Sequence, residues 1–302
     1  MPRLVSFADR AAAAMAGMRA AEQAAVRFFA ANREEVLVAS AADLAAKIGI
    51  SDATVIRAAQ ALGYAGLDGL RRQLADELRQ SLSPAARLAR TLGAVRGDVA
   101  AALGTMVDIH VAALEGLRRD IDAERFGRAV DLLAGARRIF VFGIGPSSAL
   151  ADYFAIQLGR FGVAGTSLTR TGLSLADGLC GLGAEDVVVA LAYSRVYREI
   201  EVLVAEAGRL GAPTILLTDS LGAQLGGKVD LVLPVARGRA DWFSTHTATL
   251  GLIEALLVGL AAKRPAETVA GLKRLNALRS ALAGENMALP VARRRERRRR
   301  RR

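Results

Sequence analysis

The sequence has one cysteine, two histidines and few aromatic residues, which make up 5% of its 302 residues. Cys180 cannot form an internal disulfide and matches no metal-ligand spacing, so a reducing compartment is the simplest interpretation. The N-terminus lacks a basic segment followed by an apolar core, and the apolar run 250–262 contains Glu254 and is too short to span a bilayer. We therefore expect a cytoplasmic protein that does not insert into membranes, with Cys180 as a small buried side chain.

The composition predicts a folded chain with more than one core. Hydrophobic residues make up 52% of the sequence, and 302 residues are enough for two domains. The formal charge of +11 is concentrated at the C-terminus, because residues 293–302 hold nine arginines and Glu296. That segment carries +8, which leaves only +3 for the rest. An arginine-rich end binds any polyanion without regard to sequence, and it is equally well explained as a solvated, disordered tail.

Residues 40–70, SAADLAAKIGISDATVIRAAQALGYAGLDGL, have the pattern of two helices joined by a tight turn. Ser40 can cap the first helix, whose apolar face would be Ala42, Leu44, Ala45 and Ile48, and Gly49 supplies the left-handed position that ends it. Ser51 can cap the second helix, with Val55, Ala59 and Leu62 facing inward. Gly63 would close this helix, and a third helix can begin after Gly66. The pattern predicts a helix-turn-helix, although any helical hairpin with a glycine turn has the same spacing.

The second helix offers exposed donors near its N-terminal end, where a helix in the major groove contacts bases. Arg57 could bind guanine with two hydrogen bonds, or it could be a solvated charge. The candidate DNA-binding residues are Ser51, Asp52, Thr54 and Arg57 on this helix, and Arg71 and Arg72 for the phosphate backbone.

The segment 40–70 resembles the N-terminal domain of RpiR/MurR-type transcription regulators. The resemblance implies a helical bundle, with Ala21–Ala31 as a scaffold helix and Ser51–Leu62 as the recognition helix. We place this DNA-binding domain at 1–80. A helical connector is expected at 81–120, because Ser83-Pro84 interrupts any continuous helix.

From Arg138 the pattern changes to short apolar runs separated by helical stretches. Strands are expected near 138–143, 186–191, 213–217 and 230–235, with a helix over 199–210 between two of them. Such alternation predicts a parallel sheet flanked by helices, with ligands beyond the carboxyl ends of the strands. The fold class is therefore an all-α helix-turn-helix bundle followed by an α/β domain, which we place at 121–283, before a disordered tail at 284–302.

Glycines and hydroxyls follow three of the expected strands. The first loop, 143–148 (GIGPSS), is suited to an anion at a helix N-terminus, although an ordinary strand-helix turn with a serine cap has the same sequence. It matches neither the dinucleotide-binding nor the phosphate-loop motif, so we expect no cofactor and no metal. The second loop is Tyr193-Ser194-Arg195, and the third is Thr218-Asp219-Ser220.

This region, 138 to about 263, resembles a SIS domain, the phosphosugar-binding fold, and its order after a helix-turn-helix is that of the RpiR/MurR family. The resemblance places Gly145, Ser147 and Ser148 in the first ligand loop and Ser194 in the second. Many SIS domains have glycine after that serine, and Arg195 here replaces it. The guanidinium either binds an anion or points outward, and the change puts a phosphosugar ligand in doubt. The effector-binding candidates are Gly143, Gly145, Ser147, Ser148, Ser194, Arg195, Thr218, Ser220 and His246.

Residues 243–246 are expected to start a long helix that runs through Leu260. His246 would lie near the rim of the ligand pocket, or it would simply cap or pack under that helix. His110 is expected to be a surface or packed residue. Trp242 could belong to an interface or a lid, and the sequence does not choose between them.

The expected function is that of a transcription regulator that binds a double-stranded DNA operator as a homodimer or homotetramer. Its SIS domain would bind a small anionic metabolite, such as a phosphosugar, and would change operator affinity without catalysis. Two alternatives remain: an aldose-ketose isomerase, for which no catalytic base is identified, and a nonspecific nucleic-acid-compacting protein that depends on the arginine tail.

Overall fold

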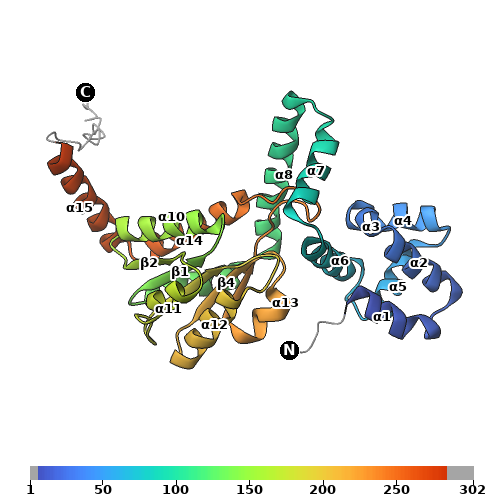
Figure 1. The fold of residues 1–302 in the computed structure, drawn as a ribbon, viewed down its shortest axis with the longest axis horizontal. Helices are drawn as coiled ribbons and strands as arrows, with labels where there is room; N and C mark the ends of the chain where they lie inside the picture. The colour runs from blue at the N-terminus through green and yellow to red at the C-terminus, as the bar shows by residue number, and fades with distance from the viewer. Residues whose placement is uncertain (1–5, 284–302) are drawn as a thin grey trace, which may run out of the picture.

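A computed structural model describes residues 6–283, apart from the side chains of 79–81. The arginine tail predicted at 284–302 lies outside the described residues. The first part of the chain is helical and the later part contains a sheet, and Figure 1 shows the helical part on one side of the sheet domain. The predicted fold class is confirmed.

The N-terminal helices pack around one apolar core centred on Phe29, Leu44 and Leu70, each fully buried. These helices are α1 (Phe7–Ala14), α2 (Ala20–Ala31), α3 (Arg33–Val38), α4 (Ala41–Ile48), α5 (Asp52–Ala61) and α6 (Leu67–Ser81). The predicted turn chemistry is confirmed. Ser40 and Ser51 accept hydrogen bonds as N-caps of α4 and α5, and Gly49 is left-handed with φ 77°. Leu44 and Ala45 are buried as expected, whereas Ala42 is exposed and does not belong to the apolar face.

Two connector helices follow, α7 (Pro84–Val95) and α8 (Val99–Asp120). Ser83 caps α7 and Pro84 occupies its first turn, so the predicted break after α6 is confirmed. One face of α8 contacts α14 (Thr247–Lys263). The opposite surface of α8 carries a row of exposed apolar side chains four residues apart, namely Val99, Leu103, Val107 and Val111. By length and composition, helix α8 is long and apolar enough to cross a membrane. Only 17% of its apolar 18-residue segment is buried in the structure.

The sheet has five parallel strands in the order β2-β1-β3-β4-β5. Their bounds are β1 (Ile139–Gly143), β2 (Gly165–Leu168), β3 (Val187–Leu191), β4 (Thr214–Thr218) and β5 (Leu231–Pro234). Alternating residues of β1 enter two different cores. Ile139 and Val141 pack toward α9 (Ala123–Gly135), α10 (Ser147–Arg160) and α14. Phe140 and Phe142 pack toward α11 (Leu173–Leu179), α12 (Arg198–Leu210) and α13 (Gly222–Leu225). Burial on both faces explains why the strands are continuously apolar.

Two sequence expectations about this domain are wrong. The helix expected to start at 243–246 begins at Thr247, so Phe243, Ser244 and Thr245 lie in the loop that follows β5. Cys180 is exposed and is not a core residue. The last described helix, α15 (Pro265–Ala283), runs away from the sheet (Figure 1).

Candidate functional site

The first candidate surface is the N-terminal turn of α5. Ser51, Asp52 and Arg57 are exposed, as a DNA-reading face requires. Thr54 was expected to face outward, but it is only 8% exposed. Its hydroxyl lies 2.9 Å from the Ser51 hydroxyl and accepts a 2.9 Å hydrogen bond from the Arg57 guanidinium. Thr54 therefore orients Arg57 toward the start of the helix.

The two arginines predicted to bind the phosphate backbone differ in their surroundings. The Arg71 guanidinium donates to the carbonyls of Val36 and Ala39 and pairs with Asp68 at 3.0 Å. It therefore ties α6 to the end of α3. Arg72 is exposed on the same helix and is the better placed of the two to bind an external anion.

The second candidate site is a cavity of about 1010 Å³ at the carboxyl ends of β1 and β3. This is the position at which open parallel sheets collect ligands. The sheet-domain side of the cavity comes from four segments at the strand ends. They are 142–147 at the end of β1, Thr171 after β2, 191–200 at the end of β3 and 237–246 after β5. The connector supplies the opposite side through Pro84, Ala85, Arg87, Leu88, Met106 and His110.

Four of the predicted effector residues line this cavity: Gly145, Ser147, Ser194 and His246. The other five lie outside its lining. Gly143 is needed for close packing, because a Cβ there would lie 2.5 Å from the Ser147 carbonyl oxygen. The Ser148 hydroxyl donates to the Gly145 carbonyl at 2.7 Å.

The third predicted loop is held by its own hydrogen bonds. The Thr218 hydroxyl accepts from the backbone N–H groups of Ser220 and Leu221, and the Ser220 hydroxyl donates to Asp219 at 2.8 Å. Arg195 is exposed. It is not among the residues that line the cavity, and a contact between its guanidinium and an anion stays a prediction.

Several polar atoms that line the cavity are buried without a hydrogen-bond partner among the described residues. They are the Ser194 and Thr245 hydroxyls, both ring nitrogens of His246 and Nδ1 of His110. Ser194 is also one of two non-glycine residues with positive φ within residues 6–283, at 61°, and its N–H donates to Asp219 at 3.0 Å. Unpaired buried polar groups are costly, so their convergence on one cavity marks a place for a polar ligand or for water.

One wall of the cavity carries the Arg237 guanidinium, and the Asp219 carboxylate lies close enough to act on the same neighbouring groups. The Arg237 guanidinium lies over the Tyr193 ring, 4.8 Å from its centroid, and His246 meets the same ring edge-on at 5.5 Å. Burial and the Arg237 charge lower the pKa of His246 to about 4, so its imidazole is neutral at pH 7. Burial raises the pKa of Tyr193, whose hydroxyl lies 3.0 Å from that of Thr249. The fixed positive charge of Arg237 favours an anionic ligand.

The sequence interpretation missed Arg237, Tyr193 and the whole connector wall. Arg237 follows β5 and is followed by Gly238, but no hydroxyl residue stands beside it. Tyr193 was placed in the second loop without a binding role. Arg87 and His110 lie far from the sheet domain in sequence, so no local pattern could place them at its strand ends.

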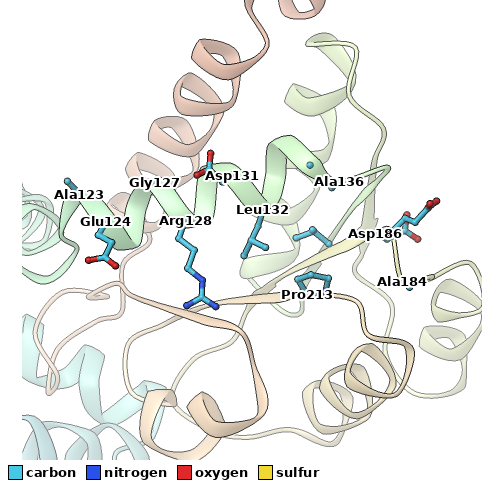
Figure 2. A pocket seen from close by; sticks show the side chains of 13 residues that line it. Ala123, Glu124, Gly127, Arg128, Asp131, Leu132, Ala136, Ala184, Asp186 and Pro213 are labelled. Atoms are coloured by element: carbon cyan, nitrogen blue, oxygen red, sulfur yellow. The ribbon is translucent and has the colours of Figure 1, made fainter.

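A second cavity, of about 650 Å³, lies at the other end of the sheet. Figure 2 shows Glu124, Arg128 and Leu132 along α9, with Leu132 next to Pro213, which precedes β4. Because this cavity is at the amino ends of the strands, it is not the expected ligand position for an open parallel sheet. Within residues 6–283, no cluster of three or more histidine, cysteine or acidic side chains is arranged to hold a metal ion.

Two family models match this chain. Residues 9–81 match the helix-turn-helix domain of the rpiR family, and residues 132–259 match the SIS domain. The chain is 33% identical over 178 residues to the bifunctional protein glk of Paraburkholderia xenovorans, covering 59% of this chain and 27% of that protein. It is 29% identical over 182 residues to the uncharacterized HTH-type transcriptional regulator YfhH of Escherichia coli, covering 59% of this chain and 63% of that protein. The chain thus spans less than two thirds of these relatives.

The fold is similar to that of the Vibrio vulnificus NanR protein, solved in complex with ManNAc-6P, with a TM-score of 0.56, 22% identity and coverage of 92% of this chain and 99% of that one. The similarity extends over both the helical part and the sheet domain. With an rpiR-type helix-turn-helix domain followed by a SIS domain, the chain belongs to the RpiR family.

Proposed function

We propose that the protein is a transcription regulator whose DNA affinity changes when a small anionic metabolite occupies the cavity at the carboxyl ends of β1 and β3. The observation that carries this proposal is the joining, in one chain, of an exposed reading helix to a cavity with unpaired polar groups. Helix α5 presents Ser51, Asp52 and Arg57 to DNA, and Arg72 contributes a phosphate contact.

The effector is a small molecule with an anionic group, such as a phosphosugar. Arg237 supplies positive charge, while Ser194 and Thr245 supply hydroxyls for hydrogen bonds. The ManNAc-6P bound by NanR supports this ligand class. Among the described residues that line the cavity there is no aspartate or glutamate, and the low pKa of His246 makes it a weak base. These features support binding without catalysis.

The regulator acts in the cytoplasm as a homodimer or homotetramer that places two copies of α5 on a near-palindromic operator. The exposed apolar row of α8 supports self-association, since such patches mark interaction surfaces.

The test is a thermal-shift and fluorescence-anisotropy comparison with glucose 6-phosphate, N-acetylmannosamine 6-phosphate and inorganic phosphate. At least one sugar phosphate should raise the melting temperature and change duplex affinity. Ser194→Ala should weaken that ligand about fivefold, because a hydrogen bond in the cavity is lost. Ser148→Ala, whose hydroxyl bonds to the protein itself, should leave it nearly unchanged. Turnover of the sugar phosphate would instead indicate an isomerase.

A further inference from the structure

The cavity lies beside the break between the DNA-binding helices and the connector. Helix α6 ends at Ser81, Leu82 and Ser83 have extended backbone conformations, and α7 begins at Pro84. Pro84 and Ala85 line the cavity directly. The cavity therefore borders the first turn of the helix that follows the break.

The loop between β5 and α14, residues 235–246, contacts both the cavity and α7. Its last residues, 243–246, line the cavity. The Phe243 N–H donates to the buried Thr91 hydroxyl at 2.9 Å. Arg90 comes directly before Thr91 in α7, and its guanidinium lies 3.9 Å from the Asp241 carboxylate. Figure 1 shows this loop passing beside α7.

Arg90 also contacts the DNA-binding helices, because its guanidinium forms an ion pair with Glu34 of α3. Helix α3 is in turn fixed to α6 by Arg71, which donates to the Val36 carbonyl at 3.0 Å. One side chain of the connector thus joins a cavity loop to the domain that carries α5.

We propose that α7 transmits occupancy of the cavity to the DNA-binding domain through Arg90, which links Asp241 of the cavity loop to Glu34 of α3. This inference rests on the proposed function and specifies its regulation. A ligand that moves residues 243–246 displaces Asp241 and α7 together, and the Arg90–Glu34 pair passes the displacement to α3. Because Arg90 and Glu34 are partly solvated, their pair should couple occupancy of the cavity to DNA affinity by a factor of about 1.4-fold to fivefold.

The single tryptophan provides a reporter of the loop. Trp242 follows Asp241, and its ring lies 4.4 Å from the Arg239 guanidinium. Acrylamide quenching of its fluorescence therefore measures the state of the cavity loop in the full chain.

The first comparison uses the protein without DNA. Glu34→Gln and Arg90→Ala should each change the Trp242 quenching constant by about 1.5-fold, because the Arg90 link is broken. Glu35→Gln is the matched control, since Glu35 pairs with Lys47 inside the DNA-binding domain. A quenching constant unchanged in both test variants, or changed equally in the control, would overturn the link.

The second comparison adds a duplex that the protein retains. Duplex binding should change Trp242 quenching in the wild type, and Glu34→Gln should remove more than half of that change. If the duplex binds and quenching does not respond, the transmission is wrong and the proposed function stands. If no duplex is retained, the proposed function fails, and the comparison without DNA still decides whether Arg90 links the loop to α3.

Discussion

His246 occupies the N-cap position of α14, where its imidazole borders the cavity beside Arg237. Burial and the neighbouring guanidinium lower its pKa from 6.5 to about 4. The unfolded chain therefore takes up a proton at this residue between pH 6.5 and 4 while the folded protein does not. The free energy of unfolding must fall as the pH falls through this window.

We expect His246 to lower the free energy of unfolding by about 1 kcal/mol at pH 4.5 relative to pH 7. This value is reduced to allow for the partial solvation of the ring. His246→Gln removes the titrating group. The fall in the free energy of unfolding between pH 7 and pH 4.5 should therefore be smaller in the variant than in the wild type by this amount. Urea unfolding at both pH values measures the difference. Identical pH dependence in the two proteins would show that His246 titrates normally in the folded state.

The residues of the cavity show how far a sequence pattern can place a site. Ser147 and Ser194 follow buried strands, and the rule that parallel strands end at one edge of the sheet brings them together. The same rule admitted Thr218 and Ser220, whose hydroxyls are used within their own loop. A motif shows that a hydroxyl lies near the strand ends, but it does not show whether the hydroxyl is already paired.

At the scale of elements, the turns and four of the strands were predictable from the sequence, whereas the edge strand β2 was not. Gly49, Ser51 and Ser83 mark helix ends by local chemistry, and the structure confirms each of them. Strand β2, with the sequence GTSL, has only one buried residue and no apolar run. It is a strand because it pairs with β1, a contact that its own residues do not encode.

Helix α15 offers a test of packing between elements. A Cβ at Gly271 would lie 2.6 Å from the carbonyl carbon of Phe161 and 2.7 Å from the N of Gly162, both backbone atoms at the end of α10. Gly271→Ala should therefore destabilise the protein by about 1–3 kcal/mol through overpacking.

The matched control for this substitution is Gly208→Ala in α12, where an added Cβ meets nothing within 4 Å. Removing a glycine from a helix without a clash should stabilise the protein by about 0.5–1 kcal/mol. Urea unfolding midpoints compare the two variants. Equal effects of the same sign would contradict the packing of α15 against the end of α10.

For the whole molecule, the division into a helix-turn-helix bundle and a parallel-sheet domain followed from the change of hydrophobic period near Arg138. The closure of the cavity by the connector did not follow, because residues near 84 and 110 meet residues near 194 and 246 only in the folded chain. Long-range placement of this kind has no local signal.

The central claim, that the folded body binds particular DNA sequences, is tested most directly by removing the arginine tail. Protein lacking residues 293–302 is mixed with sheared genomic DNA at physiological salt, and the retained fragments are sequenced. Arg57→Ala in the same truncated chain is the comparison.

We predict enrichment of a few near-palindromic sites by the truncated protein and loss of that preference in Arg57→Ala, because the base contact from α5 is worth about 1–3 kcal/mol. Uniform retention, or none, by the truncated protein would contradict a sequence-specific regulator. Preference that survives in Arg57→Ala would show that another residue of the helix-turn-helix reads the bases.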